Sequence, residues 1–328
     1  MAVNDRAFRP PVPGSNGDGA DRQTPLSPAV GARVEVAAPA KVNLALLIGP
    51  QRRDGYHEVF SLMVPVTLGD LVVAEAPLAD ELVVDCAVCP GDQNLAARAV
   101  RELEAQLGYP LPVRLTIHKR VPHAAGLGGG SSDAAAALLA VERLYGMALS
   151  PRLLHQVASA VGSDVPFFLW HGPQLAMGRG SVLKAVDLPE PLHFVIAVPA
   201  VELPTREVYG WRDADVTVGL PEFAARTGSL VSALQAATAP ADLAALVSND
   251  LESHVVARRP EIAAAKAAML QAGALAAAMS GSGAAVFGLF DGQERAEAAR
   301  SALISRAGLP PARVFTATDL QPRRSTGR

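Results

Sequence analysis

The sequence predicts an α+β fold of two domains. Hydrophobic residues make up 50% of the 328 positions and charged residues 19%, so the chain can bury a large core. Segments in which apolar residues alternate are mixed with segments of helical spacing, and no repeat of solenoid or propeller length is present. A proline-rich stretch at 189–191 separates two such regions. We therefore predict domains at residues 33–190 and 191–320.

The first region is predicted to begin with strands. Apolar residues alternate from 34 to 48, and Asp54-Gly55 marks a turn between strands. Further strands are expected at 60–67, 71–74 and 113–117, and helices at 94–107, 134–145 and 151–161. Ser131, Ser132 and Asp133 precede the second of these helices as expected capping residues, and Gly162 ends the third.

The second region is predicted to open with a strand at 194–198. Helical spacing is found at 230–237, 243–247 and 260–271, and a strand, turn and second strand are expected over 276–290, centred on Ser280-Gly281-Ser282-Gly283. Helices packed on a mixed sheet are the expected result.

The two ends of the chain are predicted to be tails. Residues 1–32 are rich in Pro, Gly, Asp and Ser and have no periodicity, so they bury too little apolar area to offset the entropy of ordering. Residues 321–328 contain no large apolar side chain. We predict a disordered tail at 1–32 and a second tail at 321–328.

Overall charge argues against polyanion-binding and membrane proteins. The formal net charge is -3 and the pI about 6.2, so the chain has no net attraction for nucleic acid or anionic membrane. No stretch approaches the roughly 18 apolar residues of a membrane span, and no signal peptide is evident. We expect a cytoplasmic protein, monomer or homodimer, that does not bind nucleic acid or membranes, although a local basic patch is still open.

Cys86 and Cys89 form a C-x-x-C pair, a spacing found in zinc and redox sites. A zinc site needs two further ligands, and the sequence has no second cysteine pair or close histidine pair to supply them. An ordinary structural role is therefore favoured.

A glycine-rich loop at 122–132 is the most informative segment, because it lies between an expected strand and a strong helix. Glycines let the backbone approach a ligand, and the helix N-terminus turns unpaired amides toward it. This arrangement is typical of a phosphate site. No Gly-Lys-Ser/Thr follows, and Ser131 replaces the third glycine of a dinucleotide fingerprint. The alternative to a phosphate site is a flexible glycine-rich turn with a serine as the helix N-cap.

This loop resembles the ATP-binding signature of GHMP kinases, P-x-x-x-G-L-G-S/G-S/G-S before a helix. The resemblance implies an N-terminal domain like ribosomal protein S5 domain 2 and a ferredoxin-like C-terminal domain, with the active cleft between them. It also assigns ATP contacts to Pro122, His123, Ala124, Ala125, Gly126, Leu127, Gly128, Gly129, Gly130, Ser131 and Ser132. The sequence at 123–125 departs from the small or Gly-rich residues frequent in relatives.

Two further motifs carry residues suited to phosphoryl transfer. Lys41 lies in an alternating apolar strand, where a cation is costly unless it is paired or used. Asp164 follows a helix end in G-S-D-V-P, where spacing alone favours a capping role. The sequences P-A-K-V-N-L and D-G-Y-H resemble the first signature of the 4-diphosphocytidyl-2-C-methyl-D-erythritol kinase family. That resemblance implies that Asp164 is the catalytic base and Lys41 its partner.

The same resemblance implies the remaining contacts. Asn43, Tyr56 and His57 would line the cytidine and sugar pocket, and Thr205 a substrate loop, whereas Asn94 and Lys119 would lie near the nucleotide. The turn at 279–284 resembles the third GHMP signature, although a plain hairpin is equally consistent with its sequence.

The expected reaction is ATP-dependent phosphorylation of the 2-hydroxyl of 4-diphosphocytidyl-2-C-methyl-D-erythritol in non-mevalonate isoprenoid biosynthesis. ATP and Mg²⁺ are the expected cofactors, with the protein ligands of Mg²⁺ unassigned. Two alternatives remain: another GHMP kinase, of homoserine or mevalonate type, and a non-catalytic nucleotide or sugar sensor.

Overall fold

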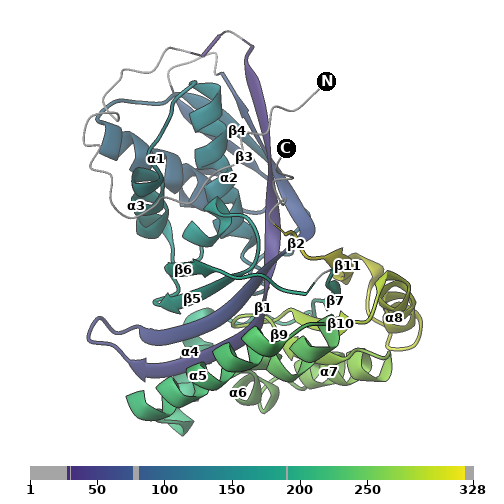
Figure 1. The fold of residues 1–328 in the computed structure, drawn as a ribbon. Helices are drawn as coiled ribbons and strands as arrows, with labels where there is room; N and C mark the ends of the chain where they lie inside the picture. The colour runs from purple at the N-terminus through teal and green to yellow at the C-terminus, as the bar shows by residue number, and fades with distance from the viewer. Residues whose placement is uncertain (1–27, 30, 77–80, 190, 322–328) are drawn as a thin grey trace, which may run out of the picture.

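The computed structural model describes residues 28–29, 31–76, 81–189 and 191–321. Most of the two predicted tails, residues 1–27, 30 and 322–328, therefore lies outside the described residues. Within these ranges two sheets and their helices form two lobes (Figure 1). No helix in the described part of the chain is long and apolar enough to cross a bilayer.

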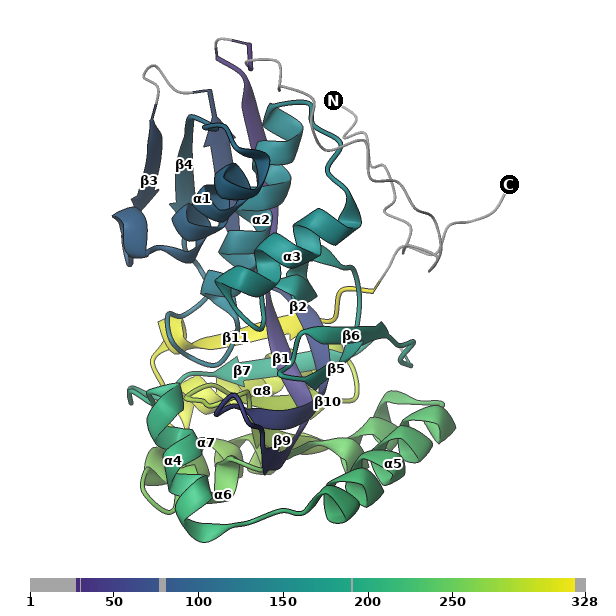
Figure 2. The same cartoon turned by 90° about the vertical axis from the view of Figure 1, so that its left-hand side faces the viewer.

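The first sheet is built on a long antiparallel pair, β1 (Arg33–Gln51) and β2 (His57–Glu75). Its order is β3 (Leu82–Cys86), β4 (Val113–His118), β2, β1 and β8 (Ser248–Asn249), with β5 (Gln174–Gly178) on β2 and β6 (Val182–Ala185) on β5. The helices α1 (Leu95–Leu107), α2 (Gly129–Leu144) and α3 (Pro151–Val161) cover one face of this sheet (Figure 2). The strands predicted at 60–67 and 71–74 are thus parts of one strand.

Local sequence explains where these helices begin. The Asn94 side chain accepts a hydrogen bond from the Ala96 amide at 2.9 Å, and Ser150 caps α3 in the same way. The capping role predicted for Ser131, Ser132 and Asp133 is wrong, because α2 already begins at Gly129. Gly128, with φ of 72°, turns the chain into the helix before the serines are reached.

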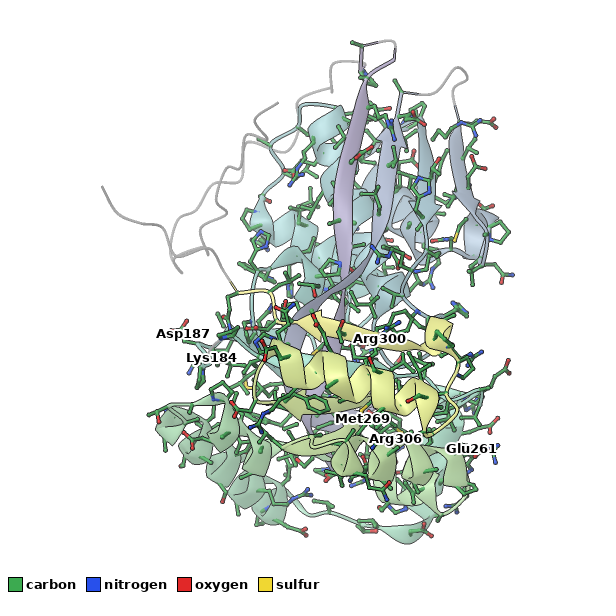
Figure 3. The ribbon with its side chains drawn as sticks, turned by 90° about the vertical axis from the view of Figure 1, so that its right-hand side faces the viewer. Lys184, Asp187, Glu261, Met269, Arg300 and Arg306 are labelled. Atoms are coloured by element: carbon green, nitrogen blue, oxygen red, sulfur yellow. The ribbon has the colours of Figure 1, made fainter. Side chains whose placement is uncertain are left out.

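The second sheet is antiparallel, in the order β11 (Val314–Thr318), β7 (His193–Ala197), β10 (Val286–Phe290) and β9 (Ala276–Met279). The helices α7 (Pro260–Gln271) and α8 (Gln293–Ser305) pack on one face, and Figure 3 shows α8 lying across it. The remaining helices of this lobe are α4 (Thr205–Asp215), α5 (Leu220–Ala236) and α6 (Glu252–Val256). The helix expected at 230–237 is thus the end of the longer α5, and most of 243–247 lies in a 3₁₀ helix, Pro240–Leu246.

The two lobes share one apolar core. Alternate residues of β7 point in opposite directions, so Phe194 packs with Val42 and Leu44 of β1, whereas Val195 packs among the residues of the helical layer. Leu127 of the glycine-rich loop belongs to the shared core and is 1% exposed. The loop is therefore anchored where the two sheets meet.

Candidate active site

The glycine-rich loop leaves β4 and leads directly into the N-terminus of α2. Gly126 and Gly128 have φ of 77° and 72°, which L side chains rarely adopt. A Cβ at Gly126 would lie 2.1 Å from the carbonyl oxygen of Ser280, so only glycine fits there. The glycines place no side chain of their own at the N-terminus of α2, where unpaired main-chain amides favour phosphate binding.

Three segments distant in sequence are hydrogen-bonded to one another at this loop. The Lys41 amide donates to the Leu127 carbonyl at 2.9 Å, and the Ala285 amide donates to the Ala125 carbonyl at 3.0 Å. The Ser280 hydroxyl donates to the Gly126 carbonyl at 3.0 Å. The turn between β9 and β10 is therefore part of the wall of the site in addition to joining two strands.

A pocket of about 420 Å³ is formed at the loop. Every predicted ATP-contact residue except Ser132 lines it: Pro122, His123, Ala124, Ala125, Gly126, Leu127, Gly128, Gly129, Gly130, Ser131, Asn94 and Lys119. Ser132 is buried in α2, and its hydroxyl has no hydrogen-bond partner among the described residues. Cys86 and Cys89 also line the pocket, and both are free thiols.

Lys41 and Asp164 are brought together although 123 positions separate them (164 minus 41). The Lys41 Nζ lies 3.6 Å from Asp164 Oδ2 and contacts Asn43 Oδ1. Lys41 is 3% exposed, and its burial lowers the pKa of the ammonium group, an effect that the Asp164 carboxylate opposes. The Asp164 side chain is 39% exposed. The arrangement is a buried cation beneath an accessible carboxylate.

Asn43 is fixed by a short hydrogen-bond chain. Its Nδ2 donates to the Ser61 hydroxyl at 2.8 Å, and that hydroxyl donates to the Ala45 carbonyl at 2.7 Å. Because both polar atoms of its side chain are engaged, Asn43 holds the Lys41 ammonium in place.

A second cleft of about 1010 Å³ adjoins the pocket and shares Ala124, Gly126, Gly128 and Thr205 with it. Lys41, Asn43, Tyr56, His57 and Asp164 line this larger cleft. At its rim the hydroxyls of Thr205 and Ser282 lie 2.9 Å apart, joining α4 to the β9–β10 turn. The two cavities therefore meet at the glycine-rich loop and Thr205, and Lys41 and Asp164 line the larger of them.

The far end of the cleft contains aromatic and charged side chains. Tyr56 is 52% exposed, and the Arg179 guanidinium lies 3.8 Å from the centre of its ring. The His57 Nε2 lies 3.0 Å from Asp213 Oδ1, and its ring centre is 5.5 Å from that of Tyr209. This end offers an exposed aromatic face beside a buried imidazole.

Lys119 lies between two buried carboxylates at the base of the loop. Its Nζ donates to Asp133 Oδ2 at 2.7 Å and also to Asp70. Burial lowers the pKa of Lys119, but the carboxylates of Asp133 and Asp70 outweigh it, so the net pKa is raised. Two carboxylates therefore fix the positively charged Lys119 side chain next to the glycines, where 12% of that side chain is exposed.

Comparisons with known proteins agree with this geometry. The model of the GHMP kinase N-terminal domain matches residues 94–172, and that of the GHMP kinase C-terminal domain matches residues 230–308. A 4-diphosphocytidyl-2-C-methyl-D-erythritol kinase from Anaeromyxobacter dehalogenans (strain 2CP-C) is 41% identical over 283 residues, which cover 84% of this chain and 86% of the relative. This chain belongs to the 4-diphosphocytidyl-2-C-methyl-D-erythritol kinase family.

Solved structures confirm the predicted GHMP kinase fold. A crystal structure titled 4-(cytidine 5'-diphospho)-2C-methyl-D-erythritol kinase matches with a TM-score of 0.71 at 37% identity, over 88% of this kinase and 99% of the other chain. A homoserine kinase from Cytophaga hutchinsonii matches with a TM-score of 0.68 at 20% identity, over 88% and 96% of the two chains. The match to the homoserine kinase shows only that the two proteins share a fold.

Sequence reasoning missed three side chains that line the cleft of this kinase, Arg179, Tyr209 and Asp213. Arg179 is flanked by glycines, a visible signal for a turn near a ligand. Tyr209 and Asp213 are four positions apart and therefore share a face of α4. The spacing shows that the two residues share a helix face. Which part of the molecule that face contacts depends on tertiary packing.

Proposed function

We propose that this kinase transfers the γ-phosphoryl group of ATP to the 2-hydroxyl of 4-diphosphocytidyl-2-C-methyl-D-erythritol, giving the 2-phosphate and ADP in the non-mevalonate pathway of isoprenoid precursor biosynthesis. The observation that carries the proposal is the pair of Lys41 and Asp164 in a large cleft that shares Gly126 and Gly128 with a glycine-lined pocket. The name of the Anaeromyxobacter relative supports the choice of substrate.

The smaller pocket fits the triphosphate of ATP. Its glycines leave main-chain amides exposed at the start of α2, and Lys119 adds a positive charge beside them. Mg²⁺ would be held mainly by the phosphates of ATP, as is usual for this ion in kinase sites. Bound ATP supplies the phosphoryl group, and Mg²⁺ would neutralise its developing charge.

Asp164 is placed to act as the general base. Its carboxylate is accessible from the cleft, where a hydroxyl of the substrate can donate to it and give up its proton as the oxygen attacks phosphorus. Lys41 lies beneath, so that its ammonium group stabilises negative charge on the attacking oxygen. Asn43 keeps the ammonium in this position.

The far end of the larger cleft would bind the cytidine end of the substrate. Tyr56 presents an exposed ring for stacking, and His57 offers ring nitrogens to the base. Thr205, at the shared rim of both cavities, would contact the substrate near the reacting groups. Together these positions lead from the base to the hydroxyl that reacts.

One assay tests the proposal: ADP release by purified protein with ATP, Mg²⁺ and each candidate alcohol. We expect turnover with 4-diphosphocytidyl-2-C-methyl-D-erythritol and none with homoserine or mevalonate. Turnover of either of these alone would favour another GHMP kinase, and ATP binding without turnover of any alcohol would favour a sensor. The cytoplasmic location and a monomeric or homodimeric state stay predictions.

A further inference from the structure

Asn249 fixes the turn between β9 and β10 from a position that lines neither cavity. Its Nδ2 donates to the Met279 carbonyl at 2.7 Å and to the Gly281 carbonyl at 2.8 Å. Its Oδ1 accepts from the Leu251 amide at 2.9 Å, at the start of α6. Both N–H bonds of this side chain are therefore used on the turn, and its oxygen is used elsewhere.

The turn that Asn249 holds lies against Lys41 and the glycine-rich loop. A Cβ added at Gly281 would lie 3.3 Å from both Lys41 Nζ and Asn43 Oδ1. The Ser280 hydroxyl accepts from the Asn43 amide at 3.3 Å and donates to the Gly126 carbonyl at 3.0 Å. A shift of the turn would therefore be felt at the lysine and at the loop together.

The carbonyl that Asn249 binds sets the direction of the next main-chain amide. The peptide bond between Gly281 and Ser282 is trans, and in a planar trans unit the C=O and N–H point in opposite directions. The Ser282 N–H therefore points away from Asn249. Among the described residues this N–H has no acceptor, and Ser282 lines the cleft that contains Lys41 and Asp164. The amide is thus available to bind a ligand in that cleft.

We propose that Asn249 is a positioning residue that directs the Ser282 main-chain amide toward the phosphoryl group during its transfer from ATP to the alcohol. The transferred group carries negative charge on its three equatorial oxygens. A fixed N–H stabilises such charge without having to reorganise in the transition state. Lys41 on β1 and the amide on the β9–β10 turn would then face the group from two elements. This inference deepens the proposed function and rests on it for phosphoryl transfer in this cleft.

Asn249→Asp tests the positioning role. The variant keeps the size of the side chain and an oxygen for the Leu251 amide, but it presents a second oxygen, in place of the two N–H donors, to the carbonyls of the turn. We expect the single-turnover rate to fall by about tenfold or more. The KM for the alcohol and the affinity for ATP should change by no more than about twofold, because the amide acts on the group in transit.

The adjacent Asp250 provides a matched control. Its carboxylate accepts from the Ile48 amide at 2.8 Å and contacts Arg226, and none of its hydrogen bonds reaches the turn. Asp250→Asn should lower the free energy of unfolding and leave the single-turnover rate unchanged. Equal rate losses in Asn249→Asp and Asp250→Asn would show that damage to this segment is being measured, and would overturn the inference.

Two variants of Ser282 test the amide itself. Proline removes the N–H and alanine keeps it, whereas both lose the contact of the hydroxyl with Thr205. The rate of Ser282→Pro should be about tenfold or more below that of Ser282→Ala. ADP with aluminium fluoride, which mimics the phosphoryl group in transit, should bind more weakly to Ser282→Pro by the same factor in the presence of the alcohol.

A double variant shows whether Asn249 acts through this amide. Asn249→Asp added to Ser282→Pro should lower the rate no further. Multiplied losses, or equal rates of the two Ser282 variants, would overturn the inference while the proposed function stands. A wild-type protein that phosphorylates homoserine or mevalonate instead would reject the proposed substrate, and the same comparison is then made with the alcohol that reacts. ATP binding without turnover of any alcohol would overturn both.

Discussion

Lys41 occupies an unfavourable position for stability. It lies inside a strand, its pKa is lowered by burial, and among the described residues its ionic partner is an accessible carboxylate 3.6 Å away. Such a cation is tolerated because the site uses its charge. Removal of the charge should therefore separate stability from activity.

Replacement of Lys41 by methionine, which is apolar and of similar length, should leave the free energy of unfolding unchanged or raise it. Turnover should fall by roughly 10²-fold or more, since a charge facing the attacking oxygen is lost. Urea denaturation and kcat provide the two measurements. Lys184→Met, at an exposed position of β6, is the control and should change neither. Strong destabilisation by Lys41→Met would contradict this view.

Asp164→Asn tests the base itself. The amide keeps the shape of the side chain but accepts no proton, so ATP affinity should be retained while kcat falls by roughly 10²–10⁴-fold. Equilibrium binding of ATP and single-turnover rates distinguish the two effects. The exposed Asp187→Asn should behave as the wild type. A near-normal kcat in Asp164→Asn would rule out the assigned role.

Asp133 should make the free energy of unfolding depend on pH in a direction that follows from its raised pKa. Burial raises its pKa to about 7, although Lys119 opposes the rise. An aspartate in the unfolded chain titrates near pH 4, so between about pH 4 and 7 the folded state binds more protons, and stability falls as pH rises. Asp133→Asn removes this loss. The variant should therefore become more stable relative to wild type as pH rises from 4.5 to 8, measured by urea denaturation; a difference that is independent of pH would contradict it.

At the residue scale, sequence reasoning singled out residues of continuous motifs, and the structure places these residues in the walls of the two cavities. Lys41 stands out as a charge in an apolar strand, and the glycine loop stands out by composition before a helix. Asp213 and Tyr209 belong to no continuous motif, and their four-residue spacing indicates only that they share a face of α4. They reach the cleft only because α4 of one lobe packs against the β1–β2 hairpin of the other, a contact set by the tertiary fold.

At the scale of elements, the glycine loop depends on two separate properties of Gly126. Its φ of 77° is costly for other residues, and an added Cβ would meet the Ser280 carbonyl oxygen. Gly126→Ala should therefore lower both the free energy of unfolding and the affinity for ATP, the latter by about tenfold or more, because the loop must move away from the β9–β10 turn.

Gly146 provides the matched control for this element. Its φ is 62°, but a Cβ there would meet nothing within 4 Å. Gly146→Ala should cost only the backbone strain of about 1 kcal/mol, with ATP affinity unchanged. Equal effects of the two variants, measured by thermal unfolding and ATP titration, would show that backbone strain alone matters and that the contact with the turn does not.

The elements predicted well are those with strong internal periodicity. Helix α7 has the predicted bounds, and α1 and α3 are marked by capping residues. The short strands β5 and β6 were not predicted, because four or five residues give little periodic signal and pair only along the edge next to β2. Strand β11 was missed for a similar reason, since its five residues complete a sheet formed by distant segments.

At the scale of the whole molecule, the long β1–β2 hairpin connects the two lobes. Its apolar residues contribute to a core that also contains Phe194 and Phe287 of the second sheet. The sequence could not show this, because its patterns indicated several short strands and a division near residue 190. The shared core leads to a prediction about whether the domains expected at 33–190 and 191–320 unfold independently.

We expect the two lobes to unfold in one cooperative transition, because β1 and β2 of the first sheet and β7 and β10 of the second form one apolar cluster. The chain has two tryptophans, Trp170 beside the first sheet and Trp211 in α4. In Trp170→Phe and Trp211→Phe the remaining tryptophan reports on one lobe, and both should give the same urea midpoint. Adding Phe287→Ala, at a site that is 0% exposed, should lower both midpoints together by the equivalent of about 3–5 kcal/mol. Two distinct midpoints, or a shift of the Trp211 signal alone, would show that the lobes are independent folding units and that the hairpin only links them.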